Sequence, residues 1–264
     1  LWGVPICVLL YIFLVWANRN INDIRKKNYF GVLWPNLLTF NILFILTAQL
    51  SNNAPTSHME LAAWHYVHDD KYEEVLSIGR RSDDSNATLT SLRNLAMAKT
   101  GRLGDLMFHY PQPYGADGLI YNKYTRQTDR YGSRTFYDHL GAEAYGGESG
   151  RAFAERMYHK TDSAIYRDLY LAALLLEKDL QTFAREASPL AKADGQLPVH
   201  YQEALLLYND QNPDTPVAFV ADTTIVNHFS DYQTLQRQYA DDAIIAKNLS
   251  KRKFGNTYWT YYDD

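Results

Sequence analysis

The chain has 264 residues, of which 46% are hydrophobic and 21% are charged, and its formal net charge is -4. This composition is typical of a folded protein and excludes a chain that is disordered throughout. Because acidic residues are in excess, it also argues against a general nucleic-acid-binding surface. The single cysteine, Cys7, cannot form an intramolecular disulfide.

The N-terminal part contains two runs without any charge, residues 1–17 and 29–50. The second run has 22 residues, and a helix of that length rises about 33 Å, enough for the roughly 30 Å hydrocarbon layer of a membrane. Residues 18–28 between the runs hold four basic side chains and one acidic one. The positive-inside rule places this loop in the cytoplasm. We therefore expect a transmembrane hairpin over residues 1–50, with the lipid bilayer of the cytoplasmic (inner) membrane as a partner and residues 51–264 periplasmic or extracytoplasmic.

Two alternatives remain for this part. The runs are also compatible with a helical hairpin buried in a soluble core. The second run, with the basic residues before it, also resembles a signal sequence cleaved near Ala48. Residue 1 is leucine and not methionine, so we expect the chain to be part of a longer protein, with the end of a larger membrane region at residues 1–50.

A short polar linker, residues 51–57, precedes a second domain that we expect over residues 58–264. Thr56 or Ser57 is a candidate N-cap of the first helix there, with Glu60 placed as in a capping box.

The stretch from residue 95 to residue 108 predicts two short helices that meet in a glycine turn, Gly101–Gly104. A similar Leu-Ala pair begins at Leu61, 34 residues before Leu95, and another begins at Leu171. Residues 137–158 show the same order of helix, glycine turn and helix, and residues 201–208 predict a further helix. The pattern predicts four or five helical hairpins.

A long irregular segment, residues 109–134, interrupts this rhythm. It contains five tyrosines, and insertions of this kind in repeat proteins often form the binding face. We name these tyrosines as the candidate partner or ligand surface: Tyr110, Tyr114, Tyr121, Tyr124 and Tyr131. The alternative is a tyrosine-rich cover packed onto the helices, since tyrosine has an apolar ring and a polar tip.

Helical spacing is clearest over residues 163–189, and a turn follows at 209–216. Residues 218–229 and 232–249 predict a final pair of helices. The aromatic tail is expected to cover the open end of the array, with an exposed peptide offered to a partner as the alternative; its aromatic residues are Phe254, Tyr258, Trp259, Tyr261 and Tyr262.

These repeats resemble the tetratricopeptide family. Leu61, Leu95 and Leu171 match the leucine of that motif's first helix, and the alanines after them match its small residue; Tyr72 resembles the aromatic residue after the turn, and Pro189 or Pro198 the closing proline. The motif's tryptophan, second alanine and proline never occur together in one copy. The resemblance implies an all-α fold, a transmembrane helical hairpin followed by a tetratricopeptide-like α-solenoid. The layout also resembles a family of uncharacterised Bacteroidota membrane proteins, which implies no activity.

Motifs for hydrolytic, redox or phosphate chemistry are absent from the sequence, so we expect no enzyme activity and no cofactor. The best metal candidate is the group His65, His68, Asp69 and Asp70, in which two histidines share a helix face. Ordinary packing and turn chemistry are the favoured explanation of these residues. Asp138 and His139 are adjacent, so on a helix they do not face each other as an acid–base pair would.

Three functions follow, and the first is favoured. The chain is expected to be a membrane-anchored, non-catalytic scaffold that binds a protein or peptide. The alternative is a module that binds a glycan or small ligand through the tyrosine-rich segment. A metal-dependent hydrolase that uses His65, His68 and Asp69 is a remote third.

Overall fold

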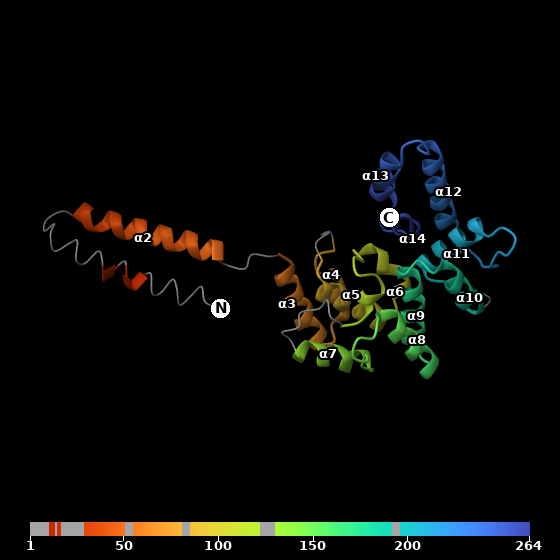
Figure 1. Cartoon of the computed structure of the whole chain (residues 1–264), viewed down its shortest axis with the longest axis horizontal. Coiled ribbons are helices and arrows are strands. Elements are labelled where there is room, and N and C mark those ends of the chain that lie inside the picture. Colours follow the sequence, from red (N-terminus) through yellow and green to blue (C-terminus); the bar gives the residue numbers. More distant parts are fainter. Residues whose placement is uncertain are drawn as a thin grey trace. The chain divides into compact units, whose positions relative to one another are not determined.

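The computed structural model describes residues 11–13, 15–16, 29–50, 55–80, 85–121, 130–191 and 196–264. All regular elements within these ranges are helices (Figure 1). The chain divides into two compact units, Leu1–Ser57 and His58–Asp264, and each is described by itself.

The first unit contains helix α2, Tyr29–Leu50. Its apolar run is interrupted by Pro35, Asn36 and Asn41, and the Asn41 side chain donates a hydrogen bond to the backbone oxygen of Leu37 at 2.8 Å. Among the helices of the described residues, none has both the length and the apolar composition that a membrane crossing requires. The prediction of a transmembrane hairpin over residues 1–50 is therefore wrong. The absence of charge does not by itself make a run a membrane span, since amide side chains within it need hydrogen-bond partners that lipid does not supply.

The basic loop from which we inferred the orientation, residues 18–28, lies outside the described residues. The extracytoplasmic location of residues 51–264 and the contact of residues 1–50 with a bilayer stay predictions.

The helices after α2 are short. They are α3 (Pro55–His68), α4 (Tyr72–Ser77), α5 (Ala87–Lys99), α6 (Leu103–Leu106), the 3-10 helices η1 (Met107–His109) and η2 (Gly115–Leu119), α7 (Arg130–Leu140), α8 (Gly150–Lys160), α9 (Ala164–Leu176), α10 (Leu180–Ala191), α11 (Val199–Gln211), α12 (Thr223–Gln238), α13 (Ala243–Phe254) and α14 (Tyr258–Asp263).

Helix α3 differs from its prediction at both its start and its packing face. It begins at Pro55, a residue tolerated in the first turn because its missing N–H would have no helical partner there. Thr56 and Ser57 therefore lie inside the helix. Leu61, assigned above to the repeat core, is 71% exposed, whereas Ala63 and Val67 are fully buried. The buried face of α3 is thus not the one that the repeat pattern indicated.

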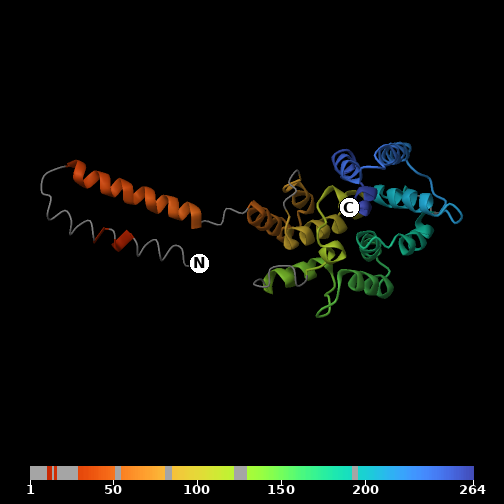
Figure 2. The same ribbon diagram turned by 45° about the horizontal axis from the view of Figure 1, so that its top comes forward.

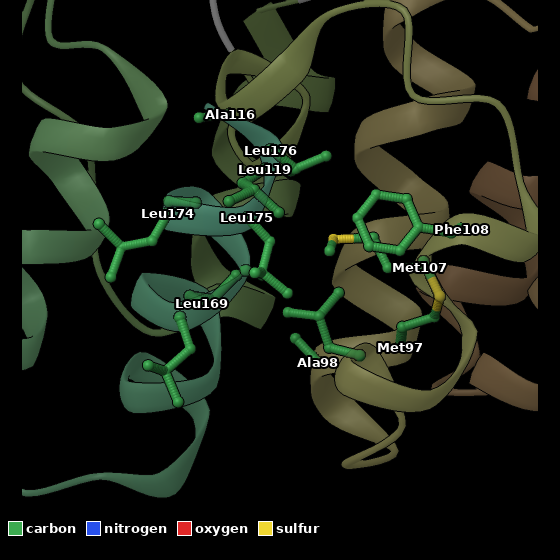
Figure 3. Close-up of a cluster of buried hydrophobic side chains, with 14 of the residues drawn as sticks. Met97, Ala98, Met107, Phe108, Ala116, Leu119, Leu169, Leu174, Leu175 and Leu176 are labelled. Atoms are coloured by element: carbon green, nitrogen blue, oxygen red, sulfur yellow. The ribbon is translucent and has the colours of Figure 1, made fainter. Parts of the chain in front are cut away.

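Helix α5 is the central element of the second unit. The Asn86 side chain caps its first turn by accepting a hydrogen bond from the N–H of Leu89, and the chain leaves α5 through Gly101, whose φ is +68°. This backbone conformation favours glycine, so the predicted turn is confirmed. Every residue of α5 from Ala87 to Ala98 is buried, because α4, η2, α7 and α9 pack around it. Figure 3 shows part of the shared core, with labelled side chains that include Met97, Ala98, Met107, Phe108, Leu119, Leu169, Leu174, Leu175 and Leu176.

Part of the irregular segment is buried within the second unit. Element η2 packs against α5, α8 and α9, and Leu119 and Ile120 are each 1% exposed. Burial of such side chains stabilises the fold by about 1.5–3 kcal/mol each. The backbone of the segment is also bound, since Ser91 donates to the oxygen of Ile120 at 2.9 Å and Asn94 to that of Gly118 at 3.0 Å. Residues 110–121 therefore complete the core of the unit.

The C-terminal helices α12 and α13 begin and end at other residues than predicted. Residues 218–229 were expected to be helical, but α12 begins at Thr223, after the N-cap Asp222. The expected break near residue 230 lies instead between Gln238 and Ala243. Helix α14 packs against α11 and α13. Tyr258 and Trp259 are fully buried in it, which confirms that the tail covers neighbouring helices.

Candidate functional site

The five tyrosines predicted to form a binding surface do not gather on one face in the described residues. Tyr110 is 6% exposed and Tyr121 is 8% exposed. The Tyr110 hydroxyl donates to the backbone oxygen of Leu76 at 2.5 Å, and its ring lies 5.0 Å from the Arg93 guanidinium carbon. Burial raises the pKa of Tyr110. These two rings are held in the core and are not open to stack on a sugar.

The other three tyrosines give less information. Tyr114 is partly exposed in the turn before η2. Tyr124 lies outside the described residues, and Tyr131 lies in α7 with its side chain outside the description.

The predicted metal candidates are arranged around the turn between α3 and α4. His65 and His68 are exposed in the last turn of α3. The Lys71 ammonium donates to Asp69 at 2.9 Å, and this hydrogen bond lowers the pKa of Asp69. In the described ranges, no group of three or more histidine, cysteine or acidic side chains has an arrangement that could hold a metal ion.

The fold brings His139 next to Tyr72 and Asp70, which the sequence analysis did not connect with it. The Tyr72 hydroxyl donates to Asp70 at 2.8 Å and lies 2.9 Å from the ring Nδ1 of His139. His139 and Asp70 are 3.3 Å apart. The pKa of Tyr72 is raised, first by burial and then by its bond to Asp70, so the phenol stays protonated. This cluster fastens the α3–α4 turn to α7. Asp138, the other member of the predicted acid–base pair, is exposed and lies 3.9 Å from Arg134.

An open pocket of about 830 Å³ lies in the second unit where η1, the N-terminal ends of α11 and α12, and the turn between α13 and α14 meet. Seven residues of its lining carry carboxylate, imidazole or ammonium groups: Asp105, His109, His200, Glu203, Asp222, His228 and Lys253. The sequence analysis assigned no role to any of these residues.

The base of the pocket is a buried pair from the first turns of α11. His200 and Glu203 are fully buried and 4% exposed, respectively. One Glu203 oxygen lies 2.8 Å from the ring Nδ1 of His200 and accepts from the N–H of Tyr258 at 2.8 Å. The N–H of Phe108 donates to Nε2 of His200 at 3.4 Å. Because Nε2 accepts, the ring proton is on Nδ1 and faces Glu203. The pair thus joins η1, α11 and α14.

Two further carboxylates of the pocket bind helix ends. Asp105 accepts from the N–H of Val199, the first residue of α11, at 2.8 Å. Asp222 accepts from the N–H of Thr224 at 2.7 Å, and this bond lowers the pKa of Asp222. Both satisfy N–H groups that have no partner within the helix. These contacts fix the ends of α11 and α12 that border the pocket.

Two histidines of the pocket, His200 and His109, have different surroundings. Both ring nitrogens of His200 are engaged in hydrogen bonds within the protein, to the N–H of Phe108 and to Glu203. His109 lies beside it, with ring centroids 5.8 Å apart. Desolvation, and next the neighbouring His200, lower the pKa of His109, so His109 is neutral at pH 7. The lining of the pocket thus combines hydrogen-bond donors and acceptors with the buried His200–Glu203 pair.

One sequence signal pointed to this floor. His200 and Glu203 are spaced i and i+3, so they share one face of a helix, and three consecutive leucines follow in α11. A polar pair on a buried helix needs internal partners. The sequence did not indicate that Phe108 and Tyr258 would provide them.

In the residues that the structure describes, the chain is an all-helical protein with a polar pocket between helix ends. Family comparison places it more closely: residues 1–145 and 147–263 match the model of a family of unknown function (DUF6057), and the chain belongs to this family. Neither a curated protein nor a solved structure gives a significant match.

Proposed function

We propose that the chain is a non-catalytic protein-interaction scaffold that binds a segment of a partner protein in the pocket between η1, α11, α12 and α13. The observation that carries the proposal is the pocket itself, about 830 Å³ in volume and open to solvent, whose floor is held by the His200–Glu203 pair.

The chemistry of the lining supports a peptide as the ligand. Asp105 and Asp222 each use one oxygen for a helix end, and a carboxylate has further acceptor sites. Lys253 and His228 add donors to the lining. A peptide backbone presents donors and acceptors in alternation, so it can bind both kinds of group.

We propose further that the helical pairs are divergent tetratricopeptide-type hairpins. In support, Leu95 and Leu171 are each 1% exposed and the alanines after them are fully buried, as that motif requires for close packing. The exposed Leu61 shows that the first copy departs from it.

The test is site-specific photo-cross-linking of the full chain in its native cells. A photoreactive residue replaces His228, which is exposed and lines the pocket. The matched control replaces Asn227, which is also exposed on α12 but is not part of the pocket lining. We expect a discrete cross-linked protein from position 228 and none from position 227, with the attached peptides identified by mass spectrometry.

A second variant, Lys253→Glu, reverses a charge in the pocket and should reduce the cross-link from position 228. Equal cross-linking from positions 227 and 228, or a yield unaffected by Lys253→Glu, would count against this pocket as the binding site. A cross-link to a glycan and not to a protein would favour the ligand-binding alternative.

A further inference from the structure

Among the described residues, helix α13 is covered on one side only. Ala246, Ser250 and Phe254 are buried at a spacing of four residues, and the helix packs against α12 and α14. Figure 2 shows α13, in dark blue, at the periphery of the second unit. The residues opposite the buried stripe, which we call the outer face of α13, are Ile244, Ile245, Asn248, Lys251 and Arg252, and all are exposed.

The outer face changes in character along the helix. Two aspartates, Asp241 and Asp242, lie exposed at its N-terminal end. Ile244 and Ile245 follow, with exposures of 74% and 43%. Lys251 and Arg252 lie at the C-terminal end and form no ion pair within the described part of the chain. From the N-terminal to the C-terminal end of α13, the outer face is therefore first acidic, then apolar and then basic.

We propose that this face binds the same face of a second copy of the chain, with the two α13 helices antiparallel about a two-fold axis. Such an axis places the acidic end of each helix opposite the basic end of the other, and the isoleucines near the centre. In a two-fold interface every contact occurs twice. The face is complementary to itself in this arrangement.

Other partners fit the face less well. An anionic membrane or an acidic peptide that approached Lys251 and Arg252 would meet repulsion from Asp241 and Asp242 only about three helix turns away, or about 14–17 Å. A basic partner would be attracted by Asp241 and Asp242 and repelled by Lys251 and Arg252. A second copy satisfies both ends and covers the two isoleucines.

The association is expected to be weak. Helix α13 has 12 residues and is about 18 Å long, so its outer face is smaller than the roughly 800 Å² per partner of a stable interface. The dimer should form at high concentration, and its affinity should fall as salt screens the paired charges.

The test uses the full chain with two different affinity tags and two charge-reversed variants. The first variant is Asp241→Lys with Asp242→Asn, because asparagine retains the N-cap function. The second is Lys251→Glu with Arg252→Glu. Co-purification is measured for the unmodified chain, for each variant with itself, and for the two variants mixed. Residues 1–50 are the same in every mixture, so any association through them is constant.

We expect each variant to pair with itself about tenfold less than the unmodified chain does, since several exposed ion pairs are replaced by like charges. The mixture of both variants should restore pairing, because a basic end then meets an acidic end on both sides. Ile244→Asp should weaken pairing in every mixture. The proposal is overturned if the unmodified chain does not pair, or if the mixed variants pair no better than each variant alone. It is equally overturned if the outer face captures only a different protein.

Discussion

Helices α5 and α13 have nearly the same length, 13 and 12 residues, and opposite environments. Helix α5 is buried from Ala87 to Ala98, and its polar side chains Ser91 and Asn94 find partners in the irregular segment. Helix α13 buries three residues on one side. Length and helical propensity do not determine this difference. It depends on whether another segment of the chain returns to cover the second face.

The largest contrast should come from removing one aliphatic side chain in each helix. Leu92→Ala in α5 empties a fully buried site and should lower the free energy of unfolding by about 2–5 kcal/mol. Ile244→Ala in α13, at a site 74% exposed, should change it by less than about 0.5 kcal/mol. Urea unfolding of both variants measures the two values. Similar losses at the two positions would mean that α13 is covered in solution.

A glycine substitution tests whether η2 is what covers α5. The Cα of Gly150, at the start of α8, faces the backbone carbonyl of Ala116 so closely that a methyl group would collide with it. Gly150→Ala should therefore displace η2 and cost about 1–3 kcal/mol or more.

Gly146 is the matched control, because a methyl group there would meet no atom within 4 Å. Gly146→Ala should be close to neutral in the same thermal unfolding experiment. If Gly150→Ala leaves hydrogen exchange at Ser91 and Asn94 unchanged, η2 does not protect α5 in the way described here.

Removal of the N-cap should give a smaller difference in stability between α5 and α13. Asn86 caps α5 and also donates to Glu60 of α3 at 2.8 Å, whereas Asp242 caps α13 alone. Asn86→Ala should cost about 1–2 kcal/mol and Asp242→Ala about 1 kcal/mol or less. Restoring the cap with Asn86→Asp should recover the local bond but not the contact with Glu60, because two carboxylates would then face each other.

The smallest effect concerns pH and the loop that precedes α8. Arg156 binds both oxygens of Glu148, at 2.7 and 2.8 Å, and this hydrogen bonding lowers the pKa of Glu148. A carboxylate with a lowered pKa stabilises the fold above its usual pKa, and the contribution is lost as the pH falls through the value in the folded protein.

The difference in stability between the unmodified chain and Glu148→Gln should therefore be near 1 kcal/mol or less at pH 7 and should shrink toward pH 3. Arg156→Gln should show the same pH dependence. A difference that grows in acid would contradict the assignment of the ion pair.

Several local features were predictable because they depend on neighbouring residues. The turn at Gly101 follows from a conformation that favours glycine. The pair α9 and α10 follows from apolar residues at helical spacing over residues 163–189. The position of α12 and α13 was missed because the caps Asp222 and Asp242, each binding an N–H of its helix, outweighed the apolar pattern.

The candidate site was not predictable for a different reason. A tyrosine-rich segment serves as core or as binding surface with the same composition, and the burial of Tyr110 and Tyr121 was decided by contacts with α3, α4 and α5. The pocket joins residues that lie far apart in sequence, so no short motif marks it.

The sequence by itself determined that the second unit is helical, where its clearest turns fall, and that its aromatic tail would be buried, because spacing and residue type act locally. Only the tertiary structure decided which helix faces are covered. It brought η2 against α5, joined His200 and Glu203 to Phe108 and Tyr258, and left the outer face of α13 open. These outcomes depend on long-range packing, in which the free energy of a contact belongs to two distant segments at once.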